Sequence, residues 1–353
     1  MAYRVIQWST GNVGAFALRC ILDHPELELA GLWVHGAAKD GRDAGELCGR
    51  PPAGVKATRD AERLLALDAD CVCYTATADL RPFEAIEDIC RILAAGKDVV
   101  SSSVVPLVHP RSFFPEVRDR LEEACRTGGT SFFTSGIDPG FANDVLPLTL
   151  SGLCQRWEEI RILEIINYAT YDQPQVLFET MGFGKPLDQT PLLLTPGTLE
   201  FAWGGTVRLL ADGLGVELED VRAVYERRPA VRPVRIGAHT VEPGTMAALR
   251  FEVQGILGGR PAIVVEHVTR LDDALAPEWP TGRGYCVVIK GTPAMRCEFE
   301  FEDERGDHAV GGVLLTATRL VNAIPAVCAA RPGLLSALDL PLVTGRGLWR
   351  GRG

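Results

Sequence analysis

The sequence has no excess of basic residues and no paired cysteine motif. The first absence argues against nucleic-acid binding and the second against a metal site. Of its 353 residues 36 are basic and 46 are acidic, which gives a net charge of -10. A chain of this charge repels a polyanion, so we expect no nucleic-acid partner. The ten cysteines are scattered without two CxxC pairs, so no metal site is expected. Cys71 and Cys73 lie in an apolar run and are interpreted as buried packing thiols.

Long apolar runs are also missing. No stretch reaches the roughly 18 apolar residues that a membrane span requires. The N-terminal segment MAYRVIQWSTG has no basic region followed by an apolar one, so no signal peptide is expected. We therefore expect a cytoplasmic protein without a membrane partner. No Walker loop, Ser-His-Asp order or internal repeat is present to indicate another class of protein.

The length predicts two domains, and the hydrophobic pattern differs between them. Over the first 140 residues short apolar runs alternate with helical patterns, which predicts a doubly wound parallel α/β sheet. The predicted strands are 4–8, 27–34, 70–75, 98–102 and 131–134, and the predicted helices are 13–22, 61–67, 82–95 and 111–126.

After residue 140 strands follow one another with few helices between them, and polar and apolar residues alternate in several. This pattern predicts a sheet with one solvated face. Segment 182–196 is rich in glycine and proline and is predicted to be a mobile loop. The predicted strands are 160–166, 249–257, 262–271, 285–290 and 294–301, and the predicted helices are 198–214 and 313–330.

A glycine turn follows the first predicted strand and opens the first predicted helix. Gly11 leaves room for a pyrophosphate, Gly14 lets the helix pack on the strand, and the helix N-terminus offers N–H groups to the anion. Ser9 stands where the first glycine of G-x-G-x-x-G usually stands. An ordinary tight turn is the alternative. We expect a nicotinamide dinucleotide on the segment Ser9, Thr10, Gly11, Asn12, Val13 and Gly14.

The end of the second predicted strand lacks the carboxylate that an NAD-preferring enzyme offers to the ribose. His35 and Gly36 stand there, and Lys39 and Arg42 follow closely enough to hold a 2′-phosphate. NADP is therefore the expected cofactor, and NAD is possible. The alternative is that these charged residues form a solvated loop that binds no ligand. Two further strand ends carry small side chains that suit a ribose and a nicotinamide, or a plain turn. They are Thr75, Ala76 and Thr77, and Ser101 and Ser102.

Five stretches carry a family resemblance: RVIQWSTGNVG, LAGLWVHGAAKDGRDAGE, GKDVVSSS, TSGIDPGFANDVLPL and ATRLVNAIPAV. In them the chain resembles the dihydrodipicolinate reductase-like oxidoreductases, in the branch of 2,4-diaminopentanoate dehydrogenase and the native amine dehydrogenases. The resemblance implies a Rossmann domain over 1–144, joined by the returning segment 316–353. It also implies an α+β substrate-binding and dimerisation domain over 145–315, built on an open mixed sheet through which a homodimer forms.

The chemistry that the resemblance implies is hydride transfer between NAD(P)H and the C=N or C=O carbon of a small carbonyl, imine or amine substrate. Amine dehydrogenases of this type carry a catalytic glutamate just after the strand that here ends at Ser101–Ser103. The segment 104–109 has no carboxylate. Two alternatives therefore stay open: carbonyl reduction without amination, and a non-catalytic NAD(P)-binding sensor.

Asp138, His109, Tyr168 and His267 are candidates for proton transfer, each with a structural alternative. For His109 the alternative is a residue that turns the chain outward before Pro110, for Tyr168 packing in a half-buried strand, and for His267 a buried, hydrogen-bonded structural histidine. Asp138 lies in a Gly-Ile-Asp-Pro-Gly turn, where an Asx turn is the alternative. His109 lies near the position of the missing glutamate. The resemblance places the substrate near segment 136–141, near Asn167 and Tyr168, and near Glu266 and His267, with Asn322 toward the nicotinamide end. Because Glu266 and His267 are adjacent in a strand, they are expected to face opposite sides of the sheet.

Overall fold

The computed structural model describes residues 2–78, 81–171 and 173–350 and divides the chain into two compact units. Unit 1 comprises Met1–Phe141 and Val313–Gly353, and unit 2 comprises Ala142–Gly312. The C-terminal segment thus belongs with the N-terminal part of the chain. Unit 1 has two hydrophobic clusters, one on each side of its sheet, and unit 2 has one.

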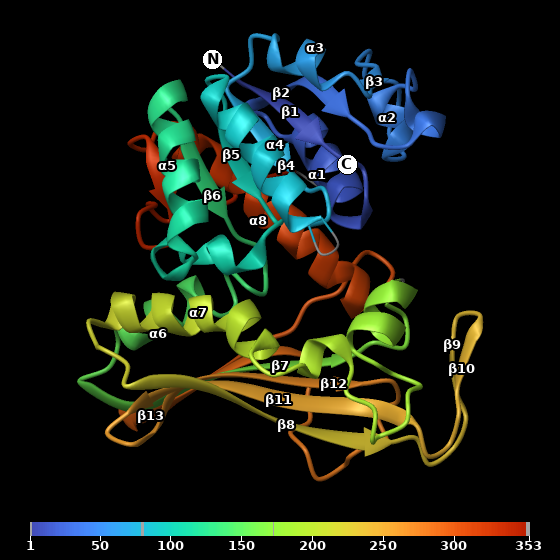
Figure 1. Cartoon of the computed structure of the whole chain (residues 1–353), viewed down its shortest axis with the longest axis vertical. Helices are drawn as coiled ribbons and strands as arrows, with labels where there is room; N and C mark the ends of the chain where they lie inside the picture. Colours follow the sequence, from blue (N-terminus) through green and yellow to red (C-terminus); the bar gives the residue numbers. More distant parts are fainter. Residues whose placement is uncertain (1, 79–80, 172, 351–353) are drawn as a thin grey trace. The chain divides into compact units, whose positions relative to one another are not determined.

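Unit 1 is built on a seven-stranded sheet whose paired strands run parallel (Figure 1). The strand order is β15-β6-β5-β4-β1-β2-β3. The central strands are short and buried along their length, as expected where helices cover both faces. The strands are β1 Tyr3–Trp8, β2 Leu27–Trp33, β3 Ala57–Thr58, β4 Cys71–Tyr74, β5 Asp98–Ser101, β6 Ser131–Thr134 and β15 Gly333–Leu335.

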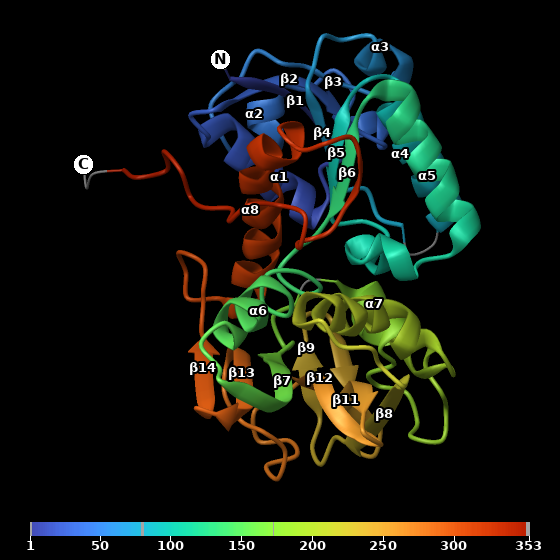
Figure 2. The ribbon, with the colours of Figure 1, turned by 90° about the vertical axis from the view of Figure 1, so that its left-hand side faces the viewer.

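Helices cover both faces of this sheet, which confirms the doubly wound fold (Figure 2). On one face Leu18 of α1 packs in the same cluster as Leu320 and Ile324 of α8, and Cys71 and Cys73 are buried there as predicted. On the other face α4 and α5 supply the core. The helices of unit 1 are α1 Asn12–Asp23, α2 Ala44–Leu47, α3 Ala61–Leu65, α4 Pro82–Ala94, α5 Pro115–Gly128 and, from Val313 onward, α8 His308–Cys328.

Unit 2 is built on a six-stranded mixed sheet in the order β14-β13-β7-β12-β11-β8. Only the β7–β12 pair is parallel among its paired strands, so the predicted open mixed sheet is confirmed. A hairpin of β9 and β10 extends beyond the ends of β8 and β11 (Figure 1). The strands are β7 Arg156–Asn167, β8 Asp220–Pro229, β9 Val234–Ile236, β10 His239–Val241, β11 Met246–Leu257, β12 Arg260–Arg270, β13 Gly284–Thr292 and β14 Met295–Phe299.

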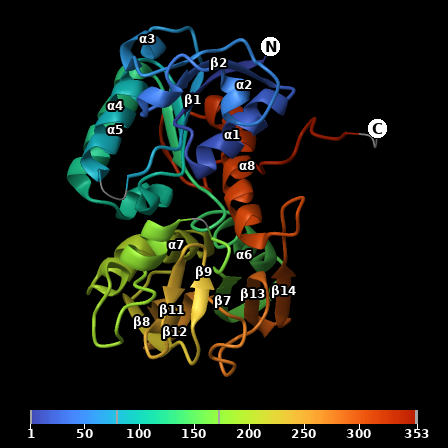
Figure 3. The same cartoon turned by 90° about the vertical axis from the view of Figure 1, so that its right-hand side faces the viewer.

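Helix α7 (Thr198–Leu214) lies across one face of this sheet, and α6 (Val145–Ser151) lies nearby (Figure 3). Trp203 of α7 contacts Phe251 of β11, with ring centroids 4.8 Å apart. Because side chains alternate along a strand, Arg250 and Glu252 face the opposite side. The helix bounds agree with the prediction of 198–214 because Gly197 and Gly215, both with left-handed backbones, flank it.

Two sequence predictions need correction, and one strand was missed. Helix α5 begins at Pro115 instead of residue 111, because proline is favoured at the first helical position and disfavours helix in the residue before it. The segment 182–196 was predicted to be mobile, but Phe183, Leu193 and Leu194 are buried in the core of unit 2. Strand β8 was not predicted, since its many charged residues hide the alternation typical of an edge strand.

Helix α8 is long and apolar enough to span a membrane by length and composition, with a mean hydropathy of 1.5. This corrects the expectation that no segment passes that test. Core helices pass it too, and Ala317, Leu320, Val321 and Ile324 are fully buried against the sheet of unit 1. Packing inside unit 1 therefore explains part of its apolar composition, since 39% of the apolar window is buried.

Candidate active site

The predicted glycine turn joins β1 to α1, and Ser9 has an unusual backbone there. Its φ of +84° lies in the left-handed region, which favours glycine. The serine thus adopts the conformation that the first glycine of the motif ordinarily provides. Ser9 therefore departs from the G-x-G-x-x-G motif in residue type but keeps the backbone conformation that glycine favours.

A buried glutamine holds this turn in place. Gln7 is fully buried, and its Nε2 donates hydrogen bonds to the Ser9 carbonyl oxygen and to Thr75 Oγ1, each 2.8 Å long. Thr75 Oγ1 in turn donates to the Trp8 carbonyl oxygen at 3.0 Å. Thr75 was predicted as a cofactor contact, whereas Gln7 was missed. A single amide within the apolar strand VIQW was the available signal.

The turn has the shape that a dinucleotide needs. A Cβ on Gly14 would lie 2.4 Å from the Ser9 carbonyl oxygen and 2.6 Å from Thr75 Oγ1, so the helix approaches the strand too closely for any side chain. A Cβ on Gly11 would meet nothing within 4 Å. Among the described residues no side chain caps the N-terminus of α1, and the first turn of this helix holds no acidic residue. Pyrophosphate can therefore approach the N–H groups of the helix.

Basic side chains lie beside this turn. Lys39 Nζ donates to both the carbonyl oxygen and Oγ1 of Thr10, each at 2.9 Å, so the predicted ammonium does reach the turn. Arg42 and His35 are exposed. Arg59, which the sequence analysis missed, donates from Nε to the His35 carbonyl oxygen at 3.0 Å. It follows β3 and therefore lies at the same strand ends as Lys39.

The ends of β4 and β5 are joined to each other by hydrogen bonds. The Ser103 hydroxyl donates to the Ala76 carbonyl oxygen, and the Ser103 N–H donates to Ser101 Oγ at 2.9 Å. The next residue, Val104, has a φ of +53°, a strained conformation for a β-branched side chain. Other predicted residues of unit 1 lie as follows: Thr77 is exposed, Ser102 and Asn322 are half-buried, and His109 is buried with Nδ1 2.9 Å from Ser112 Oγ.

A small cavity of about 40 Å³ lies at the carboxyl ends of β5 and β6 in unit 1. Asp138 lines it, together with the hydroxyl-bearing residues Ser102, Thr134, Ser135 and Thr316. Ligands of parallel α/β sheets bind outside the carboxyl ends of the strands. The structure thus places Asp138 and Ser102, two of the predicted site residues, around one cavity.

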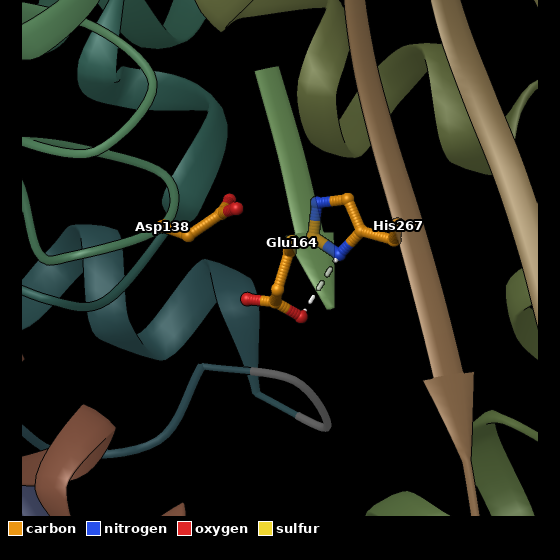
Figure 4. A group of neighbouring side chains, drawn as sticks. All are labelled: Asp138, Glu164 and His267. Atoms are coloured by element: carbon orange, nitrogen blue, oxygen red, sulfur yellow. Dashed lines mark ion pairs between the residues drawn. The ribbon is translucent and has the colours of Figure 1, made fainter. Parts of the chain in front are cut away.

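Unit 2 contains a buried carboxylate that the sequence analysis missed. Glu164 of β7 lies 3.2 Å from His267 Nδ1 through Oε1, an ion pair drawn in Figure 4, where Asp138 of unit 1 is also labelled. Its Oε2 accepts a 2.7 Å hydrogen bond from the Tyr285 hydroxyl, and Oε1 accepts a longer one of 3.4 Å from Tyr168. Two predicted residues, His267 and Tyr168, therefore meet at an unpredicted one.

Aromatic rings fix the orientation of His267. Its imidazole stacks on Phe251 with ring centroids 4.5 Å apart and packs edge-on against Trp203 at 4.8 Å. Tyr168 stacks on Tyr171 at 4.7 Å. These two ring contacts and the ion pair with Glu164 hold the imidazole from three directions.

The pair has the chemistry of an acid–base group. A carboxylate only accepts hydrogen bonds, so Nδ1 of the imidazole carries the hydrogen that faces Glu164. The second nitrogen, Nε2, is then the ring position that can gain or lose a proton. Glu266 faces the other side of the sheet, as predicted, where it pairs with Arg161 and Arg250. The signal for Glu164 was a single carboxylate in the apolar run RILEIIN.

The 2,4-diaminopentanoate dehydrogenase C-terminal domain family matches residues 141–346. The chain belongs to this family. It is 44% identical to an amine dehydrogenase from Streptomyces virginiae over 96% of both chains. It is also 24% identical to the 2,4-diaminopentanoate dehydrogenase of Acetoanaerobium sticklandii, over 72% of this chain and 70% of that protein.

Among solved structures, the amine dehydrogenase from Mycobacterium smegmatis superimposes with a TM-score of 0.78 at 19% identity, over 98% of both chains. At this identity the likeness shows a shared fold. The family and the relatives make the chain an NAD(P)-dependent, amine dehydrogenase-like oxidoreductase. The predicted family, fold and enzyme class are confirmed, and the non-catalytic alternative is not supported.

Proposed function

We propose that the protein catalyses the reductive amination of a small carbonyl compound with ammonia. Carbonyl, ammonia, NAD(P)H and a proton give the amine, NAD(P)⁺ and water. The nicotinamide, when bound, supplies the hydride that reaches the carbon. The observation that carries the proposal is the buried Glu164–His267 pair. It supplies a buried carboxylate in a chain whose segment 104–109 has none.

The pair has the parts that amination requires. Forming an imine from a carbonyl and ammonia expels water, and that step needs a proton donor near neutral pH. His267 is suited to this task because the ordinary pKa of histidine lies near neutrality. Glu164 stabilises the imidazolium and fixes the ring, and the Tyr285 hydroxyl orients the carboxylate. Asp138, Tyr168 and His109 stay candidates for proton transfer.

The proposed cofactor is NADP, held on the turn Ser9–Gly14. Lys39 lies on this turn, and Arg59 lies beside the exposed His35 at the end of β2 and β3. Apart from its Nε bond to His35, the Arg59 guanidinium makes no hydrogen bond or ion pair with the residues that the structure describes. Two cations without a nearby ribose-binding carboxylate on β2 favour a 2′-phosphate. Lys39→Ala and Arg59→Ala should each raise the NADPH Kd more than the NADH Kd.

We further propose a homodimer joined through the sheet of unit 2. The face opposite α7 carries paired charges, such as Arg250 with Glu226 and Arg161 with Glu252, together with Val224, which is 47% exposed. In a symmetric dimer the same face of a second copy would present acidic side chains to the basic ones and basic side chains to the acidic ones. Light scattering at several concentrations tests this, and Val224→Glu should shift a dimer toward monomer.

The amination itself is tested with purified protein, NADPH or NADH, and a panel of aldehydes and ketones with and without ammonium chloride. We expect NAD(P)H oxidation that depends on ammonia and an amine product detected by mass spectrometry. Equal oxidation without ammonia, with an alcohol as product, would replace the proposal with carbonyl reduction. Failure to bind either nucleotide at millimolar concentration would remove the cofactor assignment as well.

A further inference from the structure

The chain turns immediately after β7, and this turn carries Tyr168, one of the side chains that contact Glu164. The turn spans residues 167–171 of unit 2. Within it the Tyr171 N–H donates to the Tyr168 carbonyl oxygen at 3.1 Å, and the two rings stack. The Tyr168 hydroxyl donates to Glu164 Oε1, the oxygen that also faces His267 Nδ1. The backbone of the turn therefore decides where one hydrogen-bond donor of the acid–base pair lies.

The side chain of Asn167 closes the turn from within. Its Oδ1 accepts a 2.9 Å hydrogen bond from the N–H of Ala169, two residues further along, which makes an Asx turn. Its Nδ2 donates a hydrogen bond of 2.9 Å to Asp273 Oδ1. A carboxylate only accepts hydrogen bonds, so Asp273 requires the Nδ2 side of the amide to face it. Asp273 thereby orients the amide, because turning the amide over would lose both bonds.

Asp273 lies on a loop that a buried arginine holds. The loop joins β12 to β13, and Arg270 at the end of β12 is 5% exposed. The carbonyl oxygen of Arg270 accepts a 2.8 Å hydrogen bond from the Tyr168 N–H, so the turn and the loop are joined to the same residue. The Arg270 guanidinium donates three hydrogen bonds of 2.8, 3.1 and 3.0 Å to carbonyl oxygens of the loop, those of Leu275, Ala276 and Pro280.

The start of α8 contacts the turn as well. His308 Nε2 lies 2.9 Å from the Asn167 carbonyl oxygen, and because a carbonyl only accepts, this nitrogen donates. Thr170 Oγ1 donates to Asp307 Oδ1 at 3.3 Å. Partners that are 106 and 141 positions away from Asn167 in the sequence thus fix the shape of the turn.

We propose that Asn167 is a positioning residue of the acid–base group. Its amide, oriented by Asp273, holds the turn in the shape that places the Tyr168 hydroxyl against the carboxylate of Glu164. Side chains alternate along β7, so Asn167 faces the opposite side of the strand from Glu164 and acts through the turn. The inference rests on the proposed function, because the group that Asn167 serves is the Glu164–His267 pair.

Exchanging the two side chains tests the hydrogen bond between them. Asn167→Asp keeps an acceptor for the Ala169 N–H but sets a second carboxylate against Asp273, and like charges repel. We expect kcat to fall about tenfold, the effect of one lost hydrogen bond, with the KM for NADPH unchanged. In Asn167→Asp/Asp273→Asn the amide stands on the other partner and donates to the new carboxylate. The kcat of this exchange variant should return to within about twofold of the wild type.

Two further variants separate positioning from a general disturbance of unit 2. Glu278→Gln is the matched control, since Glu278 lies on the same loop, pairs with Arg228 and should leave kcat unchanged. In a Tyr168→Phe background Asn167→Asp should lower kcat little further, because the hydroxyl that the turn positions is already absent. A full tenfold fall in that background would overturn the inference. An exchange variant as impaired as Asn167→Asp would overturn it too.

A second measurement uses no turnover. In protein labelled with carbon-13 at the tyrosine Cζ, the Tyr168 resonance is the one among the six tyrosines that Tyr168→Phe removes. It should move in Asn167→Asp, return in the exchange variant and stay in place in Glu278→Gln. An unmoved resonance in Asn167→Asp would contradict the positioning role. Should Asn167→Asp fail to fold, Asp273→Ala removes the partner carboxylate without changing the turn and gives the same comparison.

The two proposals fail in different ways. If the wild type oxidises NADPH equally without ammonia, the reductive amination fails, and the tyrosine resonance then decides the positioning role by itself. If turnover depends on ammonia while Asn167→Asp keeps both its kcat and the Tyr168 resonance, the positioning role is overturned and the proposed function stands.

Discussion

The side-chain amide of Gln7 donates a 2.8 Å hydrogen bond to the carbonyl oxygen of Ser9, the residue that takes a left-handed backbone at the cofactor turn. The same nitrogen also donates to Thr75 on the neighbouring strand. One buried side chain therefore ties the strained residue to the sheet. The strained backbone of Ser9 persists because the hydrogen bonds of Gln7 to Ser9 and to Thr75 hold the turn in place.

Replacing Gln7 by leucine should loosen this turn. Both hydrogen bonds are lost, and the unfolding free energy should fall by roughly 1–3 kcal/mol because the buried Thr75 hydroxyl loses its donor. The Kd for NADPH should rise as well, since the turn no longer holds one shape. Chemical denaturation and a fluorescence titration with NADPH measure the two effects. An unchanged Kd in a destabilised protein would mean that Gln7 acts on the fold alone.

Ser9→Gly is the complementary change. Glycine adopts a positive φ without strain, which for other residues amounts to about 1 kcal/mol or more. The greater freedom of glycine in the unfolded chain offsets part of this gain. The variant should therefore be as stable as the wild type or slightly more stable, and should bind NADPH as tightly. Ser9→Val should be clearly less stable, because a β-branched residue tolerates this φ poorly.

Substitutions at Gly11 and Gly14 are expected to separate an effect on nucleotide binding from an effect on folding. A Cβ on Gly11 meets nothing within 4 Å, so Gly11→Ala should keep the Tm of the wild type. The added methyl occupies the space intended for the pyrophosphate, and the Kd for NADPH should rise at least about tenfold. A Cβ on Gly14 would lie 2.4 Å from a backbone oxygen, so Gly14→Ala should lower the Tm strongly. Tight NADPH binding by Gly11→Ala would argue against a dinucleotide on this turn.

Glu164 and Tyr285 are expected to affect turnover and not nucleotide binding. Glu164→Gln keeps the shape but removes the charge that stabilises a protonated His267, and kcat should fall by about 10²–10⁴. Tyr285→Phe removes the hydroxyl that orients Glu164 and should lower kcat less. Tyr225→Phe is its control, because Tyr225 lies on edge strand β8 and is 44% exposed. Stopped-flow measurement of NADPH oxidation gives kcat, and a Kd titration checks the nucleotide.

The sequence predicted the fold of unit 1 well because its signals are local. The apolar run from Arg4 to Trp8 and the glycines that follow determine a strand, a turn and a helix within 20 residues. The bounds of helix α7 were predicted correctly because a glycine flanks the helix at each end. The charged edge strand β8 was missed because only its pairing with β11 makes it a strand.

His267 was predicted as a site residue, but its partner Glu164 was missed for a different reason. Glu164 and His267 are 103 residues apart in the numbering, and only the parallel pairing of β7 with β12 sets them opposite each other. Tyr285 joins them from β13, on the other side of β7. Sequence reasoning sought a carboxylate where the family has one, after Ser103. The buried carboxylate beside His267 comes instead from the register of the mixed sheet of unit 2, which depends on segments distant in the sequence.

The ion pairs on the outer face of the unit 2 sheet predict how stability depends on pH. Glu252 accepts hydrogen bonds from Arg161 at 2.9 Å and from Gln254 at 2.6 Å. Burial by itself raises the pKa of this carboxyl, but the Arg161 and Gln254 hydrogen bonds outweigh it and leave the pKa below its ordinary value. Between the folded and unfolded pKa values the unfolded chain binds more protons. The stabilisation is therefore complete above about pH 5 and is lost as the pH falls below about 4.

Glu252→Gln should therefore lower the Tm near pH 7, where the wild type has the full stabilisation, by the equivalent of about 1–3 kcal/mol. Near pH 3.5 the difference between the two proteins should shrink, because Glu252 is increasingly protonated in the wild type as well. Glu298→Gln is the control: its pair with Arg296 is more than half exposed, so the Tm should change little at either pH. Thermal unfolding followed by circular dichroism from pH 3.5 to 8 measures all three proteins. A Tm difference that stays constant over this range would show that Glu252 stabilises unit 2 by packing and not by its charge.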